Sequence, residues 1–212
     1  QGLSIASDLF VDSDTDVLLP NPRWGNYDLI FDTRSQGRIV NYELMSGEGS
    51  DPSKWSFNLT GIAQAISKIQ KKGVLVLNIP SNPVGYTPSL NECKQLIDVI
   101  RSAKKPLVIL LDEAYKGMEW DDGCIKHSLI QELSSLEPER FLVLKIDGAT
   151  KEMFFFGGRI AFMTFVCGPE AAAILEEKVI ASIRSSVSAL PSPSQAMMIK
   201  ALKSPKLDAE VA

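Results

Sequence analysis

Histidine and cysteine, the side chains that build most zinc and disulfide sites, are scarce in this sequence. His127 is the only histidine among 212 residues, and the three cysteines, Cys93, Cys124 and Cys167, lie far apart without a C-x-x-C pair. A structural zinc site takes about four such ligands at short spacings. We therefore expect no metal site, and we expect the cysteines to be reduced, buried thiols of a cytoplasmic protein.

Long apolar runs and an excess of charge of one sign are also missing. No apolar stretch reaches the roughly 18 residues of a membrane-spanning helix, and no basic and then apolar signal segment opens the chain. The 22 basic and 26 acidic side chains are spread along the sequence and leave a formal charge of -4. We therefore expect neither a nucleic acid nor a membrane as a partner. Because residue 1 is glutamine rather than methionine, we expect a processed chain or an excised segment.

Apolar strands that alternate with helices are what the sequence does contain. Strands are predicted at 16–19, 38–44, 73–79, 107–111, 141–146 and 159–166. Helices are predicted at 1–10, from about 28, from 58 or 60, after a capping box at Ser89 and Glu92, at 128–136, at 168–188 and at 195–202. Residues 74–77 are continuously apolar, as in strands buried on both faces of a parallel sheet. We predict an α/β fold, with a three-layer, doubly wound, mostly parallel sheet in which strand 159–166 is antiparallel.

Polar side chains follow three of these strands at the point where each strand ends. Asn82 comes after strand 73–79, Asp112 after strand 107–111 and Lys151 after strand 141–146. In open α/β sheets, ligands bind beyond the carboxyl ends of the strands, so we expect one shared crevice. Each residue alone has a simpler explanation, as a turn starter, a helix cap and a solvated lysine respectively. Their occurrence in this order favours a site.

Residues 145–162 place an amine and a guanidinium close together in the sequence. A hydrophobic strand runs into a turn of small residues with Lys151, an aromatic patch follows, and Arg159 opens the next strand. An amine with a lowered pKa can condense with an aldehyde. A guanidinium can bind a phosphate through paired hydrogen bonds. The segment therefore suits a cofactor that carries both groups.

Four ordered blocks carry a family resemblance. Residues 22–27 (PRWGNY) are similar to a P-x-W-x-N-[HY] segment, residues 82–86 (NPVGY) to an N-P-T-G block, and residues 112–115 (DEAY) to a D-x-A-Y block. Lys151 and Arg159, eight positions apart (159 minus 151), match a lysine and an arginine at that spacing. In this order the blocks resemble the pyridoxal-phosphate-dependent aminotransferases of class I/II, the aspartate aminotransferase superfamily of fold type I. The resemblance covers nearly all of this chain and implies the large domain of such an enzyme.

The resemblance implies pyridoxal 5′-phosphate as the cofactor and a role for each matching residue. Lys151 would be catalytic: it would form a Schiff base with the cofactor and then move the proton at the substrate's α-carbon. Asp112 would hold a proton on the pyridine nitrogen, which makes the ring a better electron sink. Tyr115 and Asn82 would hydrogen-bond the 3′-oxygen of the ring, and Trp24 would stack on its face.

The phosphate end departs from the family pattern. Arg159 would bind the phosphate, and a lysine there would lose the paired geometry. Gly148 stands three positions before the lysine, where the family usually has a phosphate-binding serine, so Thr150 is the nearest hydroxyl and the candidate replacement. Ala161 stands two positions after the arginine, where glycine is common.

We assign residues 1–190 to a cofactor-binding large domain and residues 191–212 to the start of a helix that leads to a small domain. The resemblance implies that the phosphate loop, the N-terminal arm and the arginine that clamps the substrate carboxylate lie outside this chain. Amides at a helix start bind anions, and we expect them to be missing here. This chain alone should then bind the cofactor weakly or not at all and should not transaminate.

The whole enzyme is expected to be a cytoplasmic homodimer that transfers an amino group from an amino acid to a 2-oxo acid. Two alternatives stay open. Other fold-type I enzymes, such as lyases or enzymes that resemble ACC synthase, use the same residues for elimination, ring formation or decarboxylation. A non-catalytic fragment or a regulatory module that senses amino acids is the third interpretation.

Overall fold

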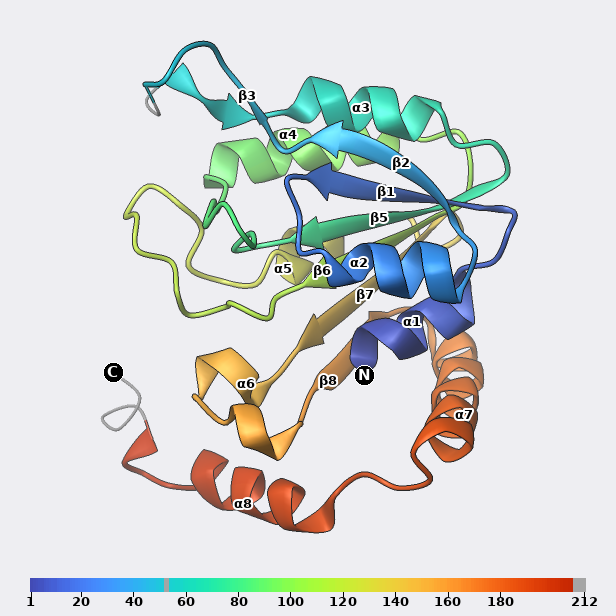
Figure 1. Ribbon diagram of the computed structural model, residues 1–212, viewed down its shortest axis with the longest axis vertical. Helices are drawn as coiled ribbons and strands as arrows, with labels where there is room; N and C mark the ends of the chain where they lie inside the picture. Colours follow the sequence, from blue (N-terminus) through green and yellow to red (C-terminus); the bar gives the residue numbers. More distant parts are fainter. Residues whose placement is uncertain (52–53, 208–212) are drawn as a thin grey trace.

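Six strands form one sheet in the order β2, β1, β5, β6, β7, β8 (Figure 1). The computed structural model describes residues 1–51 and 54–207. The strands are β1 Thr15–Asn21, β2 Arg38–Glu43, β5 Lys72–Asn78, β6 Leu107–Asp112, β7 Phe141–Asp147 and β8 Phe162–Val166. Neighbouring strands from β2 to β7 are parallel, and β8 is antiparallel to β7. The predicted mostly parallel sheet with one antiparallel strand is confirmed.

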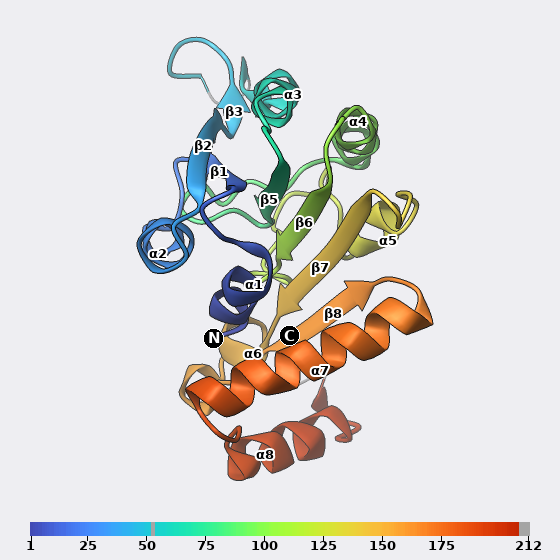
Figure 2. The same ribbon diagram turned by 90° about the vertical axis from the view of Figure 1, so that its right-hand side faces the viewer.

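Helices cover both faces of this sheet, which gives the molecule three layers (Figure 2). One face carries α3 Leu59–Ser67, α4 Leu90–Arg101 and α5 Ile130–Leu133. The other face carries α1 Gly2–Phe10, α2 Asn26–Asp28 with the π-helical turn Leu29–Arg34, and α7 Pro169–Ser186. The predicted doubly wound α/β architecture is therefore confirmed.

Strand β5 illustrates why the sheet needs both helical layers. Val74 and Val76 pack with the layer of α1 and α2, whereas Leu75 and Leu77 pack with α3 and α4. All four side chains expose at most 2% of their surface. Burying a side chain of this kind stabilises the fold by about 1.5–3 kcal/mol. The continuously apolar sequence is therefore explained by burial on both faces, because β5 lies between two hydrophobic cores.

Strand β1 is longer than predicted, and two short strands were not predicted. Strand β1 continues through Pro20, and its pairing with β5 ends at Leu18, so a residue without an N–H is tolerated beyond that point. Strands β3 Met45–Ser46 and β4 Ser56–Phe57 pair antiparallel. Two residues are too few to produce an alternating pattern, which explains why the sequence did not reveal them.

Helix α4 begins with the predicted capping box. The Glu92 N–H donates to Ser89 Oγ at 3.3 Å, and the Ser89 N–H donates to Glu92 Oε2 at 2.8 Å. The Tyr86 hydroxyl donates to Glu92 Oε1 at 2.6 Å, so the same carboxylate anchors the loop before the helix. The helix predicted at 128–136 is much shorter, a single turn at α5.

Helix α8 Ser192–Leu202 begins at Ser192 rather than at Gln195. Proline is tolerated in the first turn of a helix, where its missing N–H has no partner to lose, and the predicted break therefore lies inside the helix. Met198 of α8 is buried against Ala149 and Ile160. This contact ties α8 to the lysine segment. The boundary between residues 190 and 191 stays a prediction.

The three cysteines are free thiols, as predicted. Cys93 and Cys124 are buried, whereas Cys167 is only half-buried. Burial, followed by the charges of nearby glutamates, raises the pKa of the Cys93 thiol to about 12 and makes it unreactive at neutral pH. Across residues 1–51 and 54–207, no helix has the length and apolarity needed to cross a membrane.

The carboxyl ends of β1, β5, β6 and β7 meet at one edge of the sheet because these strands are parallel. The start of α1 lies at the same edge, with Gly2 packed against the side chain of Ile146. The segment after β7 forms the short helix α6 Ala149–Glu152. Loops from distant parts of the sequence are therefore brought together at this edge.

Candidate active site

A cavity of about 610 Å³ opens at this edge, and all seven predicted site residues line it. Trp24 precedes α2, Asn82 follows β5, Asp112 ends β6 and Tyr115 follows it, Thr150 and Lys151 lie in α6, and Arg159 lies between α6 and β8. The crevice that the strand ends predicted is present. The individual roles of these residues stay predictions.

Asp112 holds a buried carboxylate at the end of β6, with 4% of its surface exposed. Tyr27 donates its hydroxyl hydrogen to Oδ2 at 2.5 Å, and the backbone N–H of Ala114 donates to Oδ1 at 3.1 Å. Burial raises the pKa of Asp112, and the two hydrogen bonds oppose this rise. Among the described side chains, no cation pairs with this carboxylate. A positively charged ligand group beside it would stabilise its ionised form.

Trp24 forms the rim of the cavity and is held by Tyr27. The two rings meet edge to face, with their centroids 5.7 Å apart and an interplanar angle of 86°. Trp24 exposes 38% of its surface, whereas Tyr27 exposes 1%. Burial, and then the charge of Asp112, raise the pKa of Tyr27 well above its ordinary value, so Tyr27 remains a hydrogen-bond donor at neutral pH.

Asn82, Tyr115 and Lys151 form a second group in the cavity. The Asn82 side-chain amide donates to the Tyr115 hydroxyl oxygen at 3.2 Å. The ammonium of Lys151 lies 5.6 Å from the centroid of the Tyr115 ring, a cation–π contact. An amine, an amide and a phenol from three strand ends therefore face one space.

Arg159 does not begin a strand, which corrects the sequence prediction. It follows the 3₁₀ turn Phe156–Gly158 in the left-handed conformation, with φ of 52°, and β8 begins only at Phe162. The pairing of β7 with β8 ends at Asp147 and Phe162, so the preceding residues have no partner strand. The guanidinium donates to the Phe156 carbonyl oxygen at 3.4 Å and forms no ion pair with a carboxylate of the described chain.

The start of α1 lies near Arg159. Gln1, Gly2 and Leu3 line the cavity. Burial, followed by repulsion from the Arg159 guanidinium, lowers the pKa of the Gln1 amino group. The first N–H groups of a helix lack intrahelical partners and favour anions. The first turn of α1 lines the cavity, so its N–H groups are candidates to bind an anion, and the expectation that the phosphate loop lies outside this chain stays a prediction.

Gly148 and Ala161, the two departures from the family pattern, touch each other. A Cβ atom on Gly148 would lie 2.5 Å from the Ile160 carbonyl oxygen and 3.3 Å from the Cβ atom of Ala161. The backbone of Gly148 is extended, with φ of 174°, so the restriction is space rather than conformation. The two departures are therefore neighbours in space: position 148 has no side chain, and the adjacent position 161 has one. Thr150 lines the cavity one residue before the lysine.

Asp147 also lines the cavity, but its charge is compensated by Lys145, two residues earlier in the same strand. Lys145 pairs with Asp147, and its ammonium lies 4.0 Å from Glu113 Oε2. Burial raises the pKa of Glu113, and Lys145 opposes this rise. Lys151 and Arg159 are consequently the cavity-lining cations without a carboxylate partner in the part of the chain that the structure describes.

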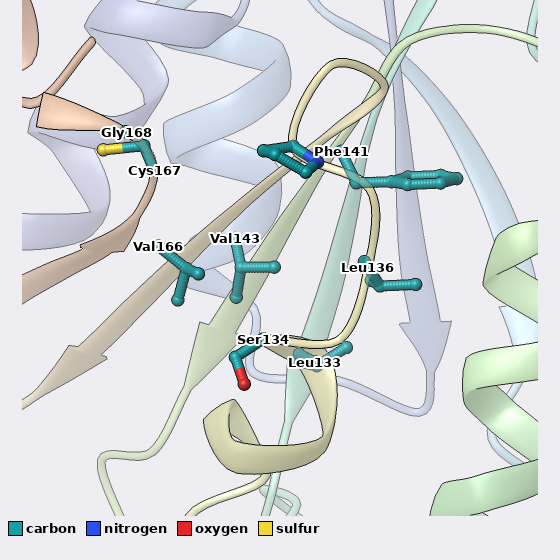
Figure 3. A pocket seen from close by; sticks show the side chains of 9 residues that line it. Leu133, Ser134, Leu136, Phe141, Val143, Val166, Cys167 and Gly168 are labelled. Carbon is teal, nitrogen blue, oxygen red and sulfur yellow. The ribbon is translucent and has the colours of Figure 1, made fainter. Parts of the chain in front are cut away.

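A second hollow, of about 280 Å³, lies beside α5 and has no charged lining (Figure 3). Val143 and Val166, paired residues of β7 and β8, lie side by side in it. Within residues 1–51 and 54–207, no three side chains among His, Cys, Asp and Glu converge as metal ligands. The larger cavity has the charged lining that this hollow lacks.

This chain is similar to known proteins in both its sequence and its fold. The sequence model of the family described as "Aminotransferase class I and II" matches residues 1–211. This chain belongs to the class I and II aminotransferases. A mitochondrial aspartate aminotransferase of Gallus gallus is 28% identical over 202 residues, which are 92% of this chain and 44% of the chicken protein.

Solved structures of aminotransferases have the same fold. An aminotransferase from Anaerococcus prevotii matches with a TM-score of 0.84 at 18% identity, over 99% of this chain and 51% of the other. An aromatic-amino-acid aminotransferase from Burkholderia pseudomallei, covalently bound to pyridoxal phosphate, matches with a TM-score of 0.71 at 20% identity, over 98% of this chain and 49% of the other. The aminotransferase chain described here thus spans about half the length of the proteins it matches.

The sequence pattern did not single out three polar residues that line the cavity of this aminotransferase chain. Tyr27 contacts Asp112, Asn78 lines the cavity from the end of β5, and Asp147 ends β7. Tyr27 was visible as the last residue of the PRWGNY block. Asn78 was visible as the one amide that closes an otherwise apolar strand. For Asp147 the signal was its place at a strand end, four positions before the lysine.

Replacing Asp112 with asparagine should change how stability depends on pH. Because the pKa of Asp112 is raised, the folded state takes up a proton more readily than the unfolded chain, and the free energy of unfolding falls as the pH rises through that pKa. We expect the stability of Asp112→Asn relative to the parent protein to be higher at neutral pH than towards about pH 4, because only the parent protein loses stability as its carboxyl group ionises.

Urea unfolding at a series of pH values measures this difference. Asp98→Asn, at an exposed carboxylate, is the control and should change stability by less than about 0.5 kcal/mol throughout. A gap between Asp112→Asn and the parent protein that stays constant from neutral to acid pH contradicts the assignment.

Gly148→Ser should destabilise the fold by about 1–3 kcal/mol, because its Cβ would press on the Ile160 carbonyl oxygen. Adding Ala161→Gly removes the neighbouring Cβ and lets that backbone move, so the double variant should recover part of the loss. Urea unfolding of the two single variants and the double variant gives the coupling between the positions. Strictly additive effects would mean that the two departures are unrelated.

Proposed function

We propose that the protein of which this chain is part is a pyridoxal-phosphate-dependent aminotransferase and that this chain carries its cofactor site. The observation that supports the proposal most is the distribution of charge in the cavity. Asp112 is a buried carboxylate without a cation, and Lys151 and Arg159 are cations without a carboxylate, among the described residues. A ligand with a basic ring nitrogen and a phosphate would complement both.

The residues present fit this cofactor by the chemistry of their donor groups. Pyridoxal phosphate supplies an aldehyde that reacts with amines and a ring that draws electrons from the substrate. Arg159 and the first N–H groups of α1 would bind its phosphate, and Thr150 would add a hydroxyl. Asp112 would accept a hydrogen bond from the protonated ring nitrogen. Trp24 would cover the ring and exclude water from one side.

The remaining polar groups would bind the ring oxygen of the cofactor and move the proton at the substrate's α-carbon. Asn82 and Tyr115, already bonded to each other, would direct their hydrogen-bonding groups to the ring oxygen. The Nζ atom of Lys151 would bind the aldehyde and, once released, would take the proton from the substrate's α-carbon and return it. The ammonium lies 5.6 Å from the centroid of the Tyr115 ring, beside the residues that would hold the ring oxygen.

The partners follow from the same reaction. We propose an amino acid and a 2-oxo acid as substrates and a homodimer as the assembly of the whole protein. Phe154 and Phe156 expose 69% and 71% of their surface between Lys151 and Arg159, and exposed aromatic groups of this size are typical of interfaces. A cytoplasmic location is proposed from the free thiols, although the chicken relative is mitochondrial.

This chain should bind pyridoxal phosphate through Lys151. Helix α1 presents its first turn to the cavity, so we expect binding where the sequence alone suggested weak or absent binding. After addition of the cofactor and reduction with borohydride, mass spectrometry should find one modification per chain, on Lys151. Lys151→Ala should lose both the modification and the visible absorption of the bound cofactor.

Lys94→Ala is the matched control, because Lys94 is an exposed lysine of α4 and does not line the cavity. It should keep the modification and the absorption unchanged. Label scattered over many exposed lysines, or a Lys151→Ala variant that binds as the parent does, would reject the proposed site.

A further inference from the structure

Asn78 is a buried amide at the end of β5 that bridges two strand ends. It exposes 5% of its surface and lines the cavity beside Asn82 and Asp112. Its Nδ2 atom donates to the Asp112 carbonyl oxygen at 3.1 Å, and its Oδ1 atom accepts the Asn82 backbone N–H at 2.6 Å. Only one orientation of the amide satisfies both partners, since one is an acceptor and the other a donor.

These bonds close a ring of contacts around the cavity. Asn78 joins Asp112 to Asn82, the Asn82 side chain donates to the Tyr115 hydroxyl, and Tyr115 follows Asp112 by three residues in the chain. Ile79 also donates its N–H to the Asp112 carbonyl oxygen at 3.1 Å. The loop after β5 and the loop after β6 are thereby fixed relative to each other.

We propose that Asn78 is a positioning residue, which holds Asn82 and Asp112 in register so that both meet one cofactor ring. Asn78 acts through its neighbours and needs no contact with the ligand. Asn82 precedes a proline, which has no backbone N–H. The backbone N–H of Asn82 is therefore a main anchor of this loop. The inference rests on the proposed function, because Asn82 and Asp112 need to be held in these positions only if both bind the same cofactor.

Two variants separate the bonds of Asn78. Asn78→Leu has a similar volume and removes both bonds. Asn78→Asp keeps an oxygen for the Asn82 N–H but places a second oxygen against the Asp112 carbonyl. Tyr42→Phe is the matched control: Tyr42 is buried and donates to the Val76 carbonyl oxygen at 2.9 Å, and it does not line the cavity.

Two measurements test the inference, one with the cofactor and one without it. NMR amide exchange in the protein without added ligand should be at least about tenfold faster at Asn82 in Asn78→Leu and nearly unchanged in Asn78→Asp. The Kd for pyridoxal phosphate, from quenching of the tryptophan fluorescence, should rise at least about tenfold in both variants. Tyr42→Phe should change neither value by more than about twofold.

Slow exchange at Asn82 in Asn78→Leu, or an unchanged Kd in a variant with fast exchange, would overturn the inference. An equal rise of the Kd in Tyr42→Phe would also overturn it, since the effect would then be general destabilisation. If Asn78→Leu does not fold, the Kd and the Asn82 exchange of Asn78→Asp decide. A parent chain that binds no cofactor would reject the proposed function, while the exchange rates still test the ring.

Discussion

The buried carboxylate of Asp112 at the end of β6 is the constraint on which the rest of the site depends. A carboxylate with 4% exposure is costly unless other groups replace its lost water. Tyr27 reaches it from α2, 85 residues earlier in the chain, and Ala114 reaches it from the following turn. Both groups donate hydrogen bonds, but neither carries a positive charge, and no cation of the described residues pairs with this carboxylate. The fold therefore holds a group that a positive ligand would stabilise.

The parallel sheet brings other polar residues into the same cavity as Asp112. Because β5, β6 and β7 end at one edge, each delivers polar residues to the same space, while their apolar centres are buried on both faces. Positive charge comes from Lys151, from Arg159 and from the start of α1. The cavity is thus acidic at the end of β6 and basic around α6 and α1. A ligand with a cationic and an anionic end would complement this distribution of charge.

Sequence reasoning predicted the sheet and the members of the site because both depend on local patterns. Apolar runs identified the strands, and the residues after them identified Asn82, Asp112 and Lys151. The conformation of Arg159 was not predictable, since it depends on where the pairing with β7 ends. The close approach of Gly148 to Ala161 and the bridge made by Asn78 depend on contacts across loops or between strands. Local patterns carry no information on such contacts.

A crystal structure of this chain grown with pyridoxal phosphate would test directly whether the cavity holds this cofactor. We expect continuous density from the Lys151 side chain to the ring, with the ring nitrogen within hydrogen-bond distance of Asp112 and the phosphate beside Arg159 and the first turn of α1. Density for the cofactor outside this cavity, or a phosphate next to Asp112, would contradict it.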